Sequence, residues 1–226
     1  MNKRPQRDLR TSLVFASDDK SLWALRENMP WPTVGDELLD PAIGSEGYVY
    51  TYEEWIPDDL DRLSFLARQY QECARDLVRQ WLKVGSSPES IVYVVGFLYR
   101  HALELNLKAI ITRHAPFRSS DPAHQAEVLK DHSLRRLWNR AKELIAGLFE
   151  AEEVKLVERL LLEVHELDAV SDGFRYPFGF LDKSGHRKPL LAGLAYSSFD
   201  NFVWILDGLN SWLRTTEDIE YYSSWE

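Results

Sequence analysis

Apolar residues recur at steps of three and four along most of the chain after residue 57, which is the spacing of one buried helix face. The pattern predicts five helices, and the turn formers between them set their ends. We therefore expect a mainly α protein, an antiparallel bundle of about five helices. The expected helices cover 58–83, 88–113, the stretch from Asp131 to Leu148, 151–168 and 197–214.

The remaining segments lack helical periodicity. Residues 1–57 are rich in Pro and Gly, and short strands are expected at 11–16 and 48–52. The sequence thus predicts an irregular appendage at 1–57 packed on the body, a helical body at 58–215, and an acidic, aromatic tail at 216–226. Two long loops are expected, at 115–130 and 169–197, and long loops in small domains are often functional.

The helix at 88–113 carries an unusual polar stripe. Ser87 and Pro88 are typical of a helix start, and apolar residues then cover most sides of the helix. His101, Glu104 and Lys108 nevertheless fall within about 60° of one another around its axis. Buried charges need partners, so the stripe is either a structural network that fixes helix register or the lining of a functional cleft.

Composition limits the class of protein. The chain has 226 residues, of which 45% are hydrophobic and 12% aromatic, enough for a sizeable core. No apolar run approaches the roughly 20 residues that span a bilayer, and Met1 to Arg10 lacks the apolar segment of a secretory signal. We expect a cytoplasmic protein that does not enter membranes. Cys73, the one cysteine, lies on a helical apolar stripe and is expected to be buried.

Charge is distributed unevenly. The formal net charge is −9, which argues against bulk coating of nucleic acid. Between Arg100 and Lys142, however, nine Lys and Arg residues stand against four acids, a local excess of five positive charges. This region is either a solvated helix face or a site for a phosphate or an RNA backbone.

Three further groups of residues could take part in chemistry. Gly173 to Pro177 is a loop in which Arg175 and Tyr176 stand beside turn formers, and Arg175 is expected to pair with Glu104 or a phosphate. An Arg and a His separated by five residues occur at Arg118 and His124 and again at Arg159 and His165. Asp131 is expected to cap a helix, and the next residue, His132, to reach the cleft of His101.

An Arg–His pair can cleave RNA without a metal. The His moves the proton of the 2′-hydroxyl and the Arg holds the charge of the transition state. His101 and His165 are the best candidates to titrate. The sequence contains no Gly-rich phosphate loop, zinc motif or nucleophile elbow, so no metal and no cofactor is expected.

The run from Tyr99 to Lys108, YRHALELNLK, resembles the first conserved helix of the HEPN superfamily of helical bundles. Segments 131–134, 166–168 and 174–177 are similar to those of bacterial HEPN-like proteins, and the resemblance covers roughly 88–215. It implies a bundle of four to five helices, frequently dimeric. Active members are metal-independent ribonucleases of toxin–antitoxin, phage-defence and CRISPR-associated systems, whose Arg and His meet at a dimer cleft.

Under this resemblance Arg159 and His165 take the catalytic positions together with His101, supported by Glu104, Lys108, His132, Arg175 and Tyr176. Leu160 stands where a polar residue is usual. Two hypotheses follow. The chain is an endoribonuclease that acts on RNA as a homodimer, with an antitoxin or defence-system protein as partner, or it is a non-catalytic module that binds a partner protein or nucleotide.

Overall fold

A computed structural model describes residues 61–85, 87–145, 147–176, 178–181, 185–191, 194 and 198–223. The chain divides into two units, Met1–Tyr50 and Thr51–Glu226, and all described residues belong to the second. The expected appendage at 1–57 and its strands lie outside the described residues. The expectation of a mainly helical chain is confirmed. Its helices are α3 (Asp61–Val84), α4 (Val92–Arg113), α5 (Ala115–Arg118), α6 (Pro122–Lys130), α7 (Leu134–Ile145), α8 (Ala151–Leu167) and α9 (Phe199–Ser223).

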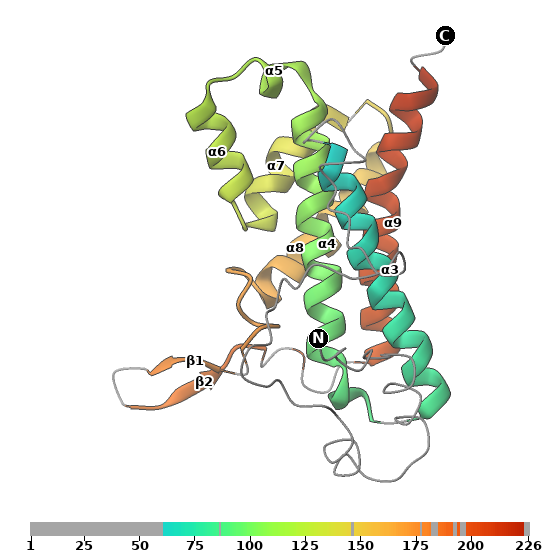
Figure 1. The fold of residues 1–226 in the computed structure, drawn as a ribbon, viewed down its shortest axis with the longest axis vertical. Coiled ribbons are helices and arrows are strands. Elements are labelled where there is room, and N and C mark those ends of the chain that lie inside the picture. The colour runs from blue at the N-terminus through green and yellow to red at the C-terminus, as the bar shows by residue number, and fades with distance from the viewer. Residues whose placement is uncertain are drawn as a thin grey trace, which may run out of the picture. The chain divides into compact units, whose positions relative to one another are not determined.

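Helix α4 is central, with α3, α7 and α9 packed against it (Figure 1). It begins after a 3-10 turn, η2 (Pro88–Ser90), so that Ser87 and Pro88 open this turn and not the α-helix itself. From Ala102 to Thr112 every residue of α4 is buried. A helix surrounded in this way has no solvated face. This explains why its sequence places apolar residues around most of the helix and not along one face.

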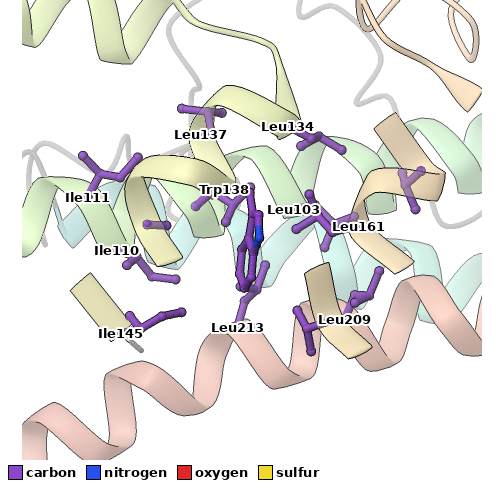
Figure 2. Close-up of a cluster of buried hydrophobic side chains, with 14 of the residues drawn as sticks. Leu103, Ile110, Ile111, Leu134, Leu137, Trp138, Ile145, Leu161, Leu209 and Leu213 are labelled. Carbon is purple, nitrogen blue, oxygen red and sulfur yellow. The ribbon is translucent and has the colours of Figure 1, made fainter. Parts of the chain in front are cut away.

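The core forms where α4, α7, α8 and α9 meet. Figure 2 shows the indole of Trp138 from α7 among leucines of the other three helices, namely Leu103, Leu161 and Leu213. All four side chains are at most 1% exposed. Full burial of one such side chain contributes roughly 1.5–3 kcal/mol, so this junction is a principal source of stability.

Helix α3 buries a different face from the one expected. Its most deeply buried residues are Ala67, Gln71 and Ala74, whereas Cys73 and Leu77 are exposed. The expectation of a buried Cys73 is therefore wrong. Small residues on the inner face let α3 lie close to α4, and larger apolar residues flank the contact. Gly85 ends α3 as expected, with a φ of 68° and its N–H bonded to the carbonyl of Trp81.

Three segments expected to be irregular contain regular structure. Residues 115–130 hold α5 and α6, because Asp121 accepts bonds from two backbone N–H groups of α6 and Pro122 fits its first turn. Residues 169–197 contain an antiparallel pair, β1 (Phe178–Leu181) and β2 (Arg187–Pro189). Helix α9 continues to Ser223, well into the expected tail.

Candidate functional site

Three charged residues occupy successive turns of α4 and are buried within it. Arg100 and Glu104 are each 1% exposed and Lys108 is 4% exposed. The Arg100 NH1 group donates to Glu104 Oε2 over 3.0 Å, and Lys108 Nζ donates to Glu104 Oε1 over 2.8 Å. One buried carboxylate is thus held between two buried cations, each four residues away along the helix.

The same cations also bond to the chain that connects α6 with α7. Arg100 NH2 donates to the carbonyl of His132 over 2.6 Å, and Lys108 Nζ donates to the carbonyl of Leu129 over 2.7 Å. These bonds satisfy two carbonyls near the ends of short helices. They fix residues 129–132 against α4, and with them the position of the His132 side chain.

His132 is the exposed end of this network. Its side chain is 62% exposed, yet its Nδ1 lies 2.9 Å from Oε1 of the buried Glu104. An ionised carboxylate can only accept hydrogen bonds, so Nδ1 donates to it, and in a neutral imidazole Nε2 then has a free lone pair. A carboxylate behind an imidazole orients the ring in this way in many hydrolases, and such an arrangement suits a general base.

The electrostatics of Glu104 favour its ionised form. Burial alone raises the pKa of the Glu104 carboxyl, but the hydrogen bonds and charges of Lys108, His132 and Arg100 together lower it below the usual range. The carboxylate therefore stays charged at neutral pH, which is the state that can accept from His132.

His101 lies beside the network and does not bond to it. Its ring stacks on Phe97 at a centroid distance of 5.8 Å and meets the edge of Tyr70 at 4.6 Å. Burial lowers the pKa of His101, and the charge of Glu104 opposes this only in part. The charges of Lys108, Arg100 and His132 lower this pKa as well.

Asp168, just after α8, closes the network from the other side. Its Oδ2 lies 3.4 Å from Nε of Arg100, an ion pair between groups that are each at most 3% exposed. Its Oδ1 accepts from the backbone N–H groups of Asp172 and Gly173. One carboxylate therefore ties the turn at 168–176 to the central helix.

The turn at 168–176 fits against α4 through a glycine. The ring of Phe174 is so near Gly96 that a Cβ there would meet Phe174 Cε1 at 2.3 Å. Within the turn, Ser171 has a φ of 64°, a left-handed conformation that is uncommon for serine. The close contact and the Asp168 bonds hold this turn in a single position.

Arg175 does not pair with Glu104, and the alternative that it pairs with a phosphate stays a prediction. Its guanidinium donates to the carbonyl of Ser171 and to the carboxylate of Asp172, and its side chain is 44% exposed. The carbon of the guanidinium lies 5.8 Å from the ring centroid of Tyr176, which is also exposed. Arg100 takes the place beside Glu104 because it is on the same helix, one turn away.

The two residues expected to form the RNA-cleaving pair make separate contacts. Arg159 is exposed, and its NH1 lies 2.6 Å from Oε1 of Glu163. His165 is partly buried, and burial together with the charge of Arg135 lowers its pKa. About 120° around α8 separates the two positions. The meeting of Arg159 and His165 at one cleft stays a prediction.

Asp131 stabilises the start of α7 indirectly. Its carboxylate accepts from the N–H of Ser133 and from the Nε and NH2 groups of Arg136. The Ser133 hydroxyl, in turn, accepts from the N–H of Arg136. Ser133 is therefore the residue that caps α7, and the expectation that Asp131 does so is wrong.

Sequence reasoning missed Arg100 and Asp168. Arg100 lies one turn before Glu104, so this four-residue spacing is a signal by which the sequence could have identified it as a second partner of the carboxylate. Asp168 gave no such signal, because its contact with Arg100 joins positions far apart in the sequence. The structure brings Glu104, Lys108 and His132 together, with His101 beside them.

A second polar cluster joins α3 and α9 on another part of the molecule. Asp207 accepts from Arg75 and Gln71, and its hydrogen bonds outweigh the effect of burial, so its pKa is lowered. Tyr99 bonds to the same carboxylate, and burial raises the pKa of its hydroxyl. This cluster forms the floor of an open pocket of about 330 Å³, whose walls include Phe199.

No family model, curated protein or solved structure matches the chain. In the part of the chain that the structure describes, no helix is both long and apolar enough to cross a membrane. Within the same residues, no three His, Cys, Asp or Glu side chains gather in a way that could hold a metal ion.

Proposed function

We propose that the chain is a metal-independent endoribonuclease of a bacterial toxin–antitoxin or phage-defence type system, with His132 as its general base. The observation that supports this most is an exposed imidazole whose Nδ1 is held at 2.9 Å by a buried, ionised carboxylate. Glu104, Arg100 and Lys108 are positioning residues in this scheme, since they fix the ring and its tautomer.

The proposed reaction is a transesterification. Nε2 of His132 removes the proton of a 2′-hydroxyl, and the oxygen attacks the adjacent phosphorus. The bond to the 5′-oxygen breaks, and protonated His132 returns the proton to this leaving oxygen. The products are a 2′,3′-cyclic phosphate and a 5′-hydroxyl end, so no net proton is consumed.

Arg135 is suited to bind the phosphate in this reaction. It lies three residues after His132, and its guanidinium pairs with Glu166 at the surface, where both side chains are about half exposed or more. An exposed ion pair contributes little energy, so the guanidinium can exchange its partner for a phosphate oxygen. Arg guanidinium binds such oxyanions through paired hydrogen bonds.

The setting of the proposed activity comes from the resemblance to the HEPN superfamily. It supports a cytoplasmic enzyme that acts on RNA, forms a homodimer and is controlled by an antitoxin or another defence-system protein. The resemblance favours Arg159 and His165 as the catalytic pair, whereas the side-chain geometry favours His132. These two versions of the site predict different effects of mutation.

The test is cleavage of a panel of single-stranded and structured RNAs by the full chain with EDTA present. We expect His132→Ala to reduce the rate by about 100-fold or more, the usual contribution of a general base, and Arg159→Ala to leave it unchanged. His124→Ala is the matched control, because His124 is also exposed and also lies near a carboxylate, that of Glu127.

Each outcome distinguishes between possible positions of the catalytic site. Loss of cleavage in Arg159→Ala and His165→Ala, with His132→Ala fully active, would move the site to α8 and overturn the role of His132. Loss in His101→Ala alone would move it to α4. If the wild-type chain cleaves no RNA and produces no cyclic phosphate ends, the nuclease proposal fails.

A non-catalytic module that binds a partner protein or nucleotide is the second candidate. It is favoured by the saturation of Glu104, whose two oxygens already accept from three donors. Such a network can serve only to hold residues 129–132 against α4. In that case neither the wild-type chain nor His132→Ala would cleave RNA above background. The substitution would change only the stability of the protein.

A further inference from the structure

We infer that the open pocket between α3 and α9 is the contact face between two copies of this chain. The inference rests on the homodimer proposed above and specifies its interface, and it does not depend on nuclease activity. The face is separate from the His132 network in its residues and its chemistry.

Large apolar side chains are exposed around this pocket. Trp204 of α9 is 80% exposed and Leu82 of α3 is 64% exposed, and both line it. Val78 and Val203 complete the apolar wall. Exposed tryptophan on a concave apolar surface is typical of a protein contact, since Trp is the residue most enriched among interface hot spots.

The polar groups at the floor of the pocket favour an apolar occupant. Asp207 accepts from Arg75, Gln71 and Tyr99, and Arg75 also donates to Glu72 and Ser211. These groups already satisfy one another. A polar ligand would gain few hydrogen bonds there, whereas an apolar side chain can cover the floor without leaving a donor or acceptor unpaired.

The pocket has two edges, one on α3 and one on α9, which we call its lips. The two lips carry opposite charges at the same height along the helices. Arg75 pairs with Asp207 and Trp81 packs on Phe199, so α3 and α9 run antiparallel side by side. Along α3, Arg79 lies between Arg75 and Trp81, and it makes an exposed pair with Asp76 of its own helix. Along α9, Asp200 lies between Phe199 and Asp207. A cationic group on the α3 lip therefore stands level with an acidic group on the α9 lip.

This arrangement is complementary to itself. A twofold axis that runs along the pocket exchanges the two lips and keeps their heights. Arg79 of each copy then faces Asp200 of the other, and Trp204 of each copy lies against the apolar α3 lip of the other, near Val78. Closed twofold contacts of this kind, in which one face pairs with itself, are the commonest form of oligomer.

The experiment is sedimentation velocity of the full chain over a wide range of concentration. We expect a species of twice the chain mass, and Trp204→Asp to weaken dimerisation by about 30-fold, the effect of losing a hot-spot tryptophan. Asp200→Arg and Arg79→Asp should each weaken it, and the two changes together should restore it. Leu156→Asp, at an exposed leucine on α8, is the control that should leave the dimer intact.

The possible failures are distinct. A wild-type chain that stays monomeric at every concentration overturns the proposed homodimer together with this face. A dimer that survives Trp204→Asp and gains nothing from the charge exchange overturns this face alone. Because the substituted side chains are exposed, unchanged circular dichroism and thermal unfolding will show that each variant folds.

Discussion

Glu104 and His132 are 28 positions apart in the chain, and a contact of 2.9 Å joins the buried carboxylate of one to the exposed imidazole of the other. The contact crosses from the interior of α4 to the surface. It depends on Arg100 and Lys108, which neutralise the carboxylate and bond to the backbone that carries His132. Changes at this network therefore alter both stability and the orientation of the imidazole.

Glu104→Gln should destabilise the protein by about 3–5 kcal/mol, because it leaves Arg100 and Lys108 buried without their shared carboxylate. The measurement is the free energy of unfolding in urea. Asp76→Asn is the control, since it breaks an exposed pair with Arg79 and should cost less than about 1 kcal/mol. Equal losses in the two variants would show that Glu104 is not the essential counter-charge.

Gly96→Ala should destabilise the protein by about 1–3 kcal/mol and loosen the turn at 168–176, because the added methyl group would overlap the ring of Phe174. Gly208→Ala, in α9, meets open space and should stabilise by up to about 1 kcal/mol, since alanine favours helix. Thermal unfolding measures both effects. Hydrogen exchange at 168–176 should increase in the Gly96 variant only, and unchanged exchange there would contradict the packing described.

Stability should fall in two stages as the pH is lowered. Burial depresses the pKa of His101 and His165 below their ordinary value of 6.5, so the folded state favours neutral imidazole. Their contribution is complete above pH 6.5 and declines below it, because the unfolded chain then binds more protons. Replacing His101 by Phe should flatten this first stage in urea titrations between pH 7 and about pH 5.

The second stage belongs to carboxylates. Glu104, Asp131 and Asp207 have pKa values held below their ordinary values of 4.5 and 3.8 by their partners, although burial opposes this. Their stabilising effect is complete above pH 4.5 and is lost as the pH falls further. Stability that stayed constant as the pH fell from 7 to well below 4 would contradict both stages.

The sequence alone determined the helical class and the places of the main helices. The spacing of apolar residues was enough to locate α7 and α8, and the order of Glu104 and Lys108 was enough to pair them, because positions four apart on a helix are neighbours. Local geometry decides such features. No distant part of the chain is needed to predict them.

Only the tertiary structure decided the rest. Which face α3 buries depends on its neighbours α4 and α9, so periodicity alone placed Cys73 on the wrong side. The contacts of Glu104 with His132 and of Arg100 with Asp168 join separate elements, whose approach is set by packing of the whole core. Spacing along the sequence is enough to predict helices and the pairs within them, whereas long-range contacts arise only when the helices have packed.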